Sequence, residues 1–231
     1  MSKRGKAYVK AKEKIAERPY AINEAVALLK EIKTAKYDES VDVAMRLSVD
    51  PKYPEQMVRG TVVLPFGTGK VKRVLVIAAG EKQKEATEAG ADFVGGDEIV
   101  EKIQKENWFD YDVVISTPDM MKSVGKLGKA LGTKGLMPSP KSGTVTFNVR
   151  DTVAEIKKGR VEFRVDKAGI INSSIAKTSF APEKIAENAK AFIGAVLKVR
   201  PATLKGKYVK SVFISSTMSP SIKLDISELE I

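Results

Sequence analysis

The stretch Arg73-Val-Leu-Val-Ile-Ala-Ala-Gly80 is a nearly unbroken apolar run in a chain of 231 residues. Such a run is typical of a strand in a parallel sheet, because both faces of such a sheet are covered. A strand with one face in water would instead alternate apolar and polar residues. The stretch therefore predicts that the middle of the chain folds as a three-layer α/β domain.

The segments after this strand alternate between helix and strand. We expect a polar helix over residues 81–89, a short strand over 92–95 and a second buried strand over 112–117. This alternation is typical of a doubly wound, Rossmann-like domain, which we expect over residues 67–159. Asp97 is the expected N-cap of one helix, and Pro118 is expected to open another. The second of these helices carries apolar residues at helical spacing, namely Met121, Val124, Leu127 and Leu131.

The flanks of this block have the alternating pattern of strands with only one covered face. Every second residue from Val41 to Val49 is apolar, and Val161, Phe163 and Val165 repeat the pattern. Further strands are expected over 60–66, 208–216 and 222–226, and helices over 22–32 and from Pro182 onward. Neither flank has enough strands for a good sheet of its own. We therefore expect an α/β protein of two domains, in which residues 1–66 and 160–231 form one split, sandwich-like domain and 67–159 are inserted into it.

The basic charge of the chain lies mainly in the two flanks. Residues 67–159 contain 15 Lys and Arg against 13 Asp and Glu, a net charge of +2, which leaves +9 of the total of +11 for the flanks. An excess of this size attracts polyanions, and nucleic acid is the commonest polyanion in a cell. The first part of this excess is segment 3–14, with six basic residues and one acidic residue, which we expect to be a solvated arm or a frayed helix.

The composition argues against most kinds of catalysis. The chain has no Cys and no His, which excludes Cys-ligated metal sites and nucleophile pairs that use His. Its longest apolar run, residues 74–79, is far shorter than the roughly 20 residues that span a bilayer. The basic start lacks the apolar stretch of a signal peptide. We expect a cytoplasmic protein that is not an enzyme and binds no cofactor, metal or membrane.

Two glycine-rich segments resemble phosphate-binding loops. In Phe66-Gly-Thr-Gly-Lys70 the lysine is followed by Val71 and then a strand, so the pattern lacks both the Ser or Thr and the helix of a P-loop. We expect hinges between the domains at Gly67, Gly69 and Gly159. The segment 125–141 is rich in Gly, Lys and Pro, and it fits a phosphate-binding loop and a capped helix end equally well.

Three short segments of the flanks combine polar and apolar groups that suit RNA. Segment 36–40, Lys-Tyr-Asp-Glu-Ser, offers a ring and carboxylates, and Arg164, Asp166 and Lys167 lie together near the end of a strand. Carboxylates can accept hydrogen bonds from a ribose 2′-hydroxyl. The uncharged turn Thr217-Met-Ser-Pro220 could fill an RNA minor groove. The simpler alternatives are a packed tyrosine, a solvated strand surface and an ordinary turn.

The chain resembles the bacterial large-subunit ribosomal protein L1 family along essentially its whole length. The segments that carry the resemblance are Gln56-Met-Val-Arg-Gly-Thr-Val-Val-Leu-Pro65, 125–141, Gly159-Arg-Val-Glu-Phe-Arg-Val-Asp-Lys167 and Thr217-Met-Ser-Pro220. The resemblance implies an RNA-binding domain built from both termini and an inserted Rossmann-like domain without a nucleotide. It implies RNA contacts at Lys36, Tyr37, Glu39, Ser40, Arg164, Asp166, Lys167, Ser216, Thr217, Met218, Ser219 and Pro220.

The same resemblance implies three RNA partners and a regulatory role. These partners are the stalk region of large-subunit ribosomal RNA, tRNA leaving the exit site, and the messenger of the protein's own operon, whose translation the protein represses. We expect a monomer outside the ribosome. The alternative is a nucleotide-binding enzyme built on the insert, for which the sequence has no glycine fingerprint.

The chain departs from the usual family pattern at a few positions. Tyr37 stands for a common Phe, Ser40 for Thr, Asn172 for His and Ser139 for Asn. Ser219 stands for the glycine of a turn that usually reads Thr-Met-Gly-Pro. If this position needs a positive φ, a residue other than glycine costs about 1–2 kcal/mol. We therefore expect a reshaped turn or weaker RNA binding.

Overall fold

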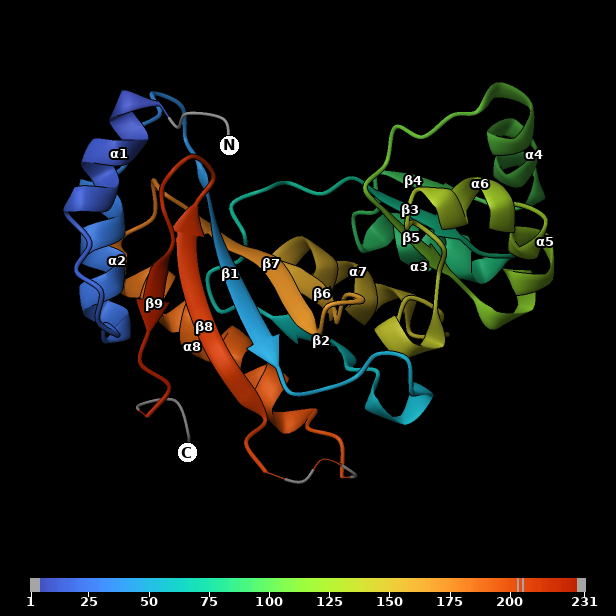
Figure 1. Ribbon diagram of the computed structural model, residues 1–231. Helices are drawn as coiled ribbons and strands as arrows, with labels where there is room; N and C mark the ends of the chain where they lie inside the picture. Colours follow the sequence, from blue (N-terminus) through green and yellow to red (C-terminus); the bar gives the residue numbers. More distant parts are fainter. Residues whose placement is uncertain (1–4, 203, 205, 228–231) are drawn as a thin grey trace. The chain divides into compact units, whose positions relative to one another are not determined.

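The computed structural model describes residues 5–202, 204 and 206–227 (Figure 1). The chain divides into two compact units. The first, which we call the split unit, comprises Met1–Gly69 and Val161–Ile231. The second, the inserted unit, comprises Lys70–Arg160. Each unit has its own buried core.

The split unit is built on a four-stranded antiparallel sheet with the strand order β7-β1-β8-β9. Its strands are β1 (Ser40–Leu47), β7 (Ile170–Lys177), β8 (Val209–Ser216) and β9 (Ile222–Leu224). The central pair, β1 and β8, joins the two ends of the sequence, because Val41 lies opposite Ser216. Neither flank could therefore form this sheet alone.

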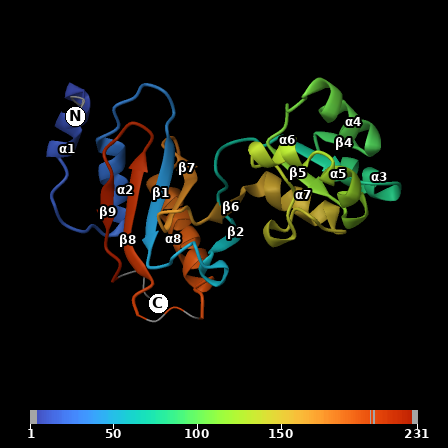
Figure 2. The same cartoon turned by 45° about the vertical axis from the view of Figure 1, so that its right-hand side comes forward.

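One face of this sheet is covered by helices, and the other is open (Figure 2). The covering helices are α2 (Ile22–Glu31) and α8 (Pro182–Lys198), which also pack against each other. Val41, Val43 and Met45 of β1 point toward them and are fully buried. The residues between them are partly exposed, as expected for the alternation of a half-covered strand.

A two-stranded sheet, a 3-10 turn and a helix complete the split unit. A two-stranded sheet is formed by β2 (Arg59–Val63) and β6 (Arg160–Arg164), preceded by a 3-10 turn, η1 (Pro54–Gln56). The basic segment 3–14, for which an arm or frayed helix was expected, contains the helix α1 (Lys6–Glu13); its residues 3 and 4 lie outside the described part. Buried Ala11 attaches this helix to the core.

The inserted unit contains a parallel sheet with the strand order β4-β3-β5. Its strands are β3 (Val74–Ile77), β4 (Phe93–Gly95) and β5 (Val113–Ser116). Every residue of β3 is fully buried, because helices cover both faces. This confirms the three-layer, Rossmann-like fold predicted from the apolar run at Arg73–Gly80.

The two faces of β3 belong to different helix layers. Val74 and Val76 pack with α3 (Glu81–Glu88) and α7 (Val149–Lys158), whereas Leu75 and Ile77 pack on the opposite side. That opposite layer consists of α4 (Asp97–Glu106), η2 (Pro118–Met120), α5 (Met121–Gly125) and α6 (Gly128–Thr133). A 3-10 turn, η3 (Pro140–Ser142), leads toward α7.

The structure corrects several details of the sequence prediction. Asp97 does not cap α4, because Gly96 is the N-cap and no side chain bonds to the helix start. The single helix expected from Pro118 is broken into η2, α5 and α6. Helix α7 and strand β7 were not predicted. In the described part of the chain, no helix has the length and apolar character needed to cross a membrane.

Candidate functional site

The buried carboxylate of Glu39 organises one end of the four-stranded sheet. One carboxylate oxygen accepts a hydrogen bond from the Ala35 N–H at 2.9 Å. The other accepts from the Ser216 hydroxyl and, at 3.2 Å, from the Met218 N–H. Glu39 is fully buried, so its side chain holds these two loops together instead of facing solvent.

The turn at residues 216–220 is held against the start of β1. The Thr217 N–H donates to the Ser40 carbonyl at 3.1 Å, and the Ser40 N–H donates to the Thr217 hydroxyl at 3.2 Å. Met218 is the apex of the turn, and 56% of its surface is exposed. The turn therefore presents a large apolar side chain on a firmly bonded backbone.

Ser219 is built into this turn without backbone strain. It is not among the residues with positive φ, so the cost that a glycine position would impose does not arise. Its hydroxyl accepts a hydrogen bond from the Ser216 N–H at 2.9 Å, and the residue is 9% exposed. The cost expected for a positive φ at this position is therefore absent.

Segment 36–40 lies beside the turn and is also fixed. Asp38 accepts hydrogen bonds from the Thr178 hydroxyl at 3.0 Å and from the Ser179 N–H and hydroxyl at 2.9 Å each. Burial raises the pKa of Asp38, but these hydrogen bonds outweigh it and hold the pKa below its usual range. Lys36 and Tyr37 remain exposed, with 55% of Tyr37 accessible.

The remaining predicted residues lie at the opposite end of β1. The Asp166 N–H donates to the carbonyl of Ile170, the first residue of β7. Ile170 pairs with Arg46, which lies six residues along β1 from Ser40. At about 3.3 Å per residue this is a separation of roughly 20 Å. Arg164, Asp166 and Lys167 are all exposed. The predicted contact residues thus form two groups, one at each end of the sheet.

Asp166 also shapes its own turn between β6 and β7. One of its carboxylate oxygens accepts from the N–H groups of Ala168 and Ile170, both at 2.8 Å. Gly169 closes this turn with a φ of 76°, and a side chain there would approach the Val49 carbonyl oxygen at 3.1 Å. Part of the Asp166 carboxylate is therefore structural.

The open face of the sheet connects the two groups. Across its middle, Ala44 of β1 lies between Asn172 of β7 and Phe213 of β8. Asn172 is exposed and Phe213 is half-buried, while the exposed Arg46 lies further along β1. Sequence reasoning did not assign these three to the site. It could not place Asn172 on this face because β7 was not recognised.

The glycines predicted as hinges are held to different degrees. The buried side chain of Asn188 on α8 accepts from the Phe66 N–H at 3.2 Å and donates to the Gly67 carbonyl at 2.9 Å and the Ile175 carbonyl at 2.8 Å. A side chain at Gly69 would meet Lys177 at 2.8 Å. Gly159 closes α7 with a φ of 105°. Their role as hinges remains a prediction.

The inserted unit lacks the features of a nucleotide site at the ends of its strands. Helix N-termini attract phosphate in such folds. Here the first turn of α3 contains Glu81, and that of α4 contains Asp97 and Glu98, which oppose an anion. The segment 125–141 comprises the last residue of α5, all of α6 and a loop that leads into η3. Within the described residues, no cluster of acidic side chains could hold a metal ion.

Comparison with known proteins identifies the family. Residues 29–220 match the model of the Ribosomal protein L1p/L10e family. The chain is 58% identical over 229 residues to the large ribosomal subunit protein uL1 of Solibacter usitatus (strain Ellin6076). This alignment covers 99% of the chain and 97% of that protein. Both descriptions name ribosomal proteins, which are structural components of the ribosome and not enzymes. The chain therefore belongs to the ribosomal protein L1p/L10e family.

Proposed function

We propose that the chain binds the stalk region of large-subunit ribosomal RNA through the split unit. The observation that supports this most strongly is the 216–220 turn, which presents Met218 on a backbone fixed by the buried Glu39. Groups held in place before binding lose little conformational entropy when they meet a partner. In this proposal Glu39 and Ser216 position the turn, and Thr217, Met218 and Tyr37 contact the RNA.

Attraction and recognition are assigned to different groups. The excess of Lys and Arg in the flanks supplies long-range attraction, which does not depend on RNA sequence. The neutral turn and the open sheet face supply the shape that fits sugar edges and unstacked bases. Because the two groups of predicted residues lie at opposite ends of β1, the proposed RNA site is elongated along the sheet.

Two further roles follow from the family resemblance. We propose that the same surface binds a similarly folded region in the messenger of the protein's own operon and thereby represses its translation. We also propose that the protein assists the release of tRNA from the exit site. In solution, before it joins the subunit, the protein is proposed to be a monomer.

Salt-dependent binding measurements test the proposal. Met218→Ala should weaken binding to a transcript of the ribosomal stalk region about fivefold or more, with an unchanged salt slope, because it removes shape and no charge. Lys36→Gln should instead flatten the salt slope by roughly one unit if Lys36 contacts a phosphate. Val199→Ala is the control, since Val199 is also exposed in the split unit but lies at the end of α8, on the covered side of the sheet. Full affinity of Met218→Ala would overturn the role of the turn.

Removal of the inserted unit tests where the RNA site lies. A chain in which Gly69 is linked to Val161 through a short flexible spacer should keep most of its affinity for the stalk transcript. The split unit has its own core, so the shortened chain is expected to fold. If the excised inserted unit bound the transcript as well as the whole chain does, the site would be misplaced.

A further inference from the structure

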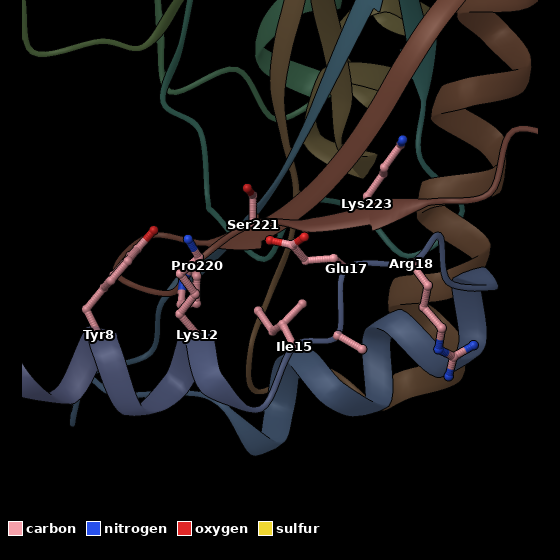
Figure 3. A pocket seen from close by; sticks show the side chains of 9 residues that line it. Tyr8, Lys12, Ile15, Glu17, Arg18, Pro220, Ser221 and Lys223 are labelled. Atoms are coloured by element: carbon pink, nitrogen blue, oxygen red, sulfur yellow. The ribbon is translucent and has the colours of Figure 1, made fainter.

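A hollow beside the 216–220 turn shares only Pro220 with the site described above. It has a volume of about 450 Å³, within the range of sites that hold small ligands. One wall comes from α1 and the segment after it, and the other from the chain that follows the turn (Figure 3). The residues that line it are Tyr8, Lys12, Ile15, Ala16, Glu17, Arg18, Pro220, Ser221 and Lys223.

The walls of this hollow are fixed by the core of the split unit. Ala11 is buried and Ile15 packs against the core, so α1 is attached on its inner side. The Ala16 N–H donates to the Tyr20 hydroxyl at 2.8 Å. The Tyr20 N–H in turn donates to the Lys223 carbonyl at 3.0 Å, which joins the two walls. The hollow is therefore a property of the folded unit.

The side chains in the hollow differ in chemistry. Tyr8 and Lys12 point from α1 toward Pro220, and the Glu17 carboxylate points toward Ser221 (Figure 3). Arg18 turns away, and it forms an ion pair with Glu24. The hollow thus combines an aromatic ring, a cation and a carboxylate.

We propose that this hollow is a subsite for one unstacked ribonucleotide of the RNA that is bound at the turn. Lys12 is the partner for a phosphate and the Tyr8 ring for a base, since rings of this kind stack on bases of any type. Glu17 accepts from a 2′-hydroxyl or a base amino group. A simple anion would use neither the ring nor the carboxylate and would be repelled by the latter.

The position of the hollow connects it to the proposed RNA surface. Pro220 ends the turn that presents Met218, so an RNA strand on this turn passes directly to the hollow. At the other rim, Lys223 is exposed and pairs with Phe213, whose side chain belongs to the open sheet face. This inference rests on the proposed RNA binding and extends it to the N-terminal helix.

Matched substitutions on α1 test the subsite. Lys12→Gln should flatten the salt slope for the stalk transcript by roughly one unit, whereas Lys10→Gln, an exposed lysine of the same helix outside the hollow, should change it much less. Tyr8→Leu should weaken binding at least about fivefold, and Tyr8→Phe should keep the affinity. Melting temperatures of the variants show whether the fold is preserved.

Crosslinking separates a local contact from a general charge effect. A stalk transcript containing 4-thiouridine should crosslink, on irradiation, to the peptide that contains Tyr8 and Lys12. The subsite would be overturned if Lys12→Gln and Lys10→Gln had the same salt slope and Tyr8→Leu kept full affinity. The proposed function would still stand in that case, provided that Met218→Ala binds the transcript weakly. A wild-type chain that does not bind the transcript would overturn both.

AMP alone, added at millimolar concentration, should not raise the melting temperature of the protein. If it does, the hollow takes free nucleotides instead of a nucleotide of the bound RNA.

Discussion

Replacing the buried Glu39 by glutamine perturbs the 216–220 turn without touching its surface. The two carboxylate oxygens accept hydrogen bonds from the Ala35 N–H, the Ser216 hydroxyl and the Met218 N–H. Glutamine keeps one of these oxygens and replaces the other by an NH2 group. If the remaining oxygen stays with Ala35, the NH2 group can donate to the Ser216 hydroxyl oxygen but faces the Met218 N–H, another donor.

The expected cost can be estimated from these bonds. One part-buried N–H without an acceptor costs about 1–3 kcal/mol, and a bond to a neutral group is weaker than one to a charged group. Glu39→Gln should therefore lower the free energy of unfolding by about 2 kcal/mol, measured by urea denaturation. Because the lost bond fixes Met218, the affinity for the stalk transcript should fall about tenfold at fixed salt.

The control is the same chemical change at Glu31, an exposed residue at the end of α2. Removal of a negative charge alone strengthens binding to a polyanion or leaves it unchanged. The change in affinity for the stalk transcript should therefore differ between the two variants, and only Glu39→Gln should bind more weakly than the wild type. If Glu39→Gln bound the transcript as tightly as Glu31→Gln does, the positioning role of Glu39 would be refuted.

Three further outcomes are expected. Asn188→Ala should lower the free energy of unfolding by about 3 kcal/mol, because three backbone groups lose their buried partner. A urea midpoint close to that of the wild type would contradict this. The Val74 N–H, and then Lys157, hold the pKa of Asp92 below its usual range against the opposing effect of burial. The ionised Asp92 carboxylate therefore stabilises the fold above about pH 4, and this contribution is lost as the pH falls through the lowered pKa. Between about pH 4 and pH 2 the wild type should lose more stability than Asp92→Asn does. Equal losses of stability would refute this. Ser219→Gly should lower the melting temperature by a few degrees, because it removes a bonded hydroxyl and gives the unfolded backbone more freedom. A higher melting temperature would show that the hydroxyl does not stabilise the turn.

The fold could be predicted largely because its strands have clear patterns. The apolar run at Arg73–Gly80 and the alternation at Val41–Val49 separate a doubly covered strand from a half-covered one. Strand β7 was missed because its middle, Asn172-Ser173-Ser174, is polar on both faces. It is identified as a strand only by its pairing with β1, a contact between residues far apart in the sequence.

The candidate site was predictable in its parts but not in its arrangement. The resemblance identified the 216–220 turn and segment 36–40, and the pairing of β1 with β8 brings them together. It gave no sign that Glu39 is buried, because an acidic residue in a polar, charged segment looks exposed in the sequence. The positive φ considered for Ser219 was also not found, since the hydroxyl bonds inside the turn. The bonds from Glu39 to Ser216 and Met218 join residues far apart in the sequence, and no local pattern encodes them.

Protection of methionines from oxidation tests the central claim most directly. Met218 is 56% exposed at the apex of the proposed RNA surface, and the partly exposed Met137 lies in the inserted unit. Mild peroxide treatment of the full chain, followed by mass spectrometry, gives the rate at which each becomes the sulfoxide. With the stalk transcript bound, oxidation of Met218 should slow severalfold while that of Met137 stays the same. Unchanged oxidation of Met218 together with protection of Met137 would contradict the account.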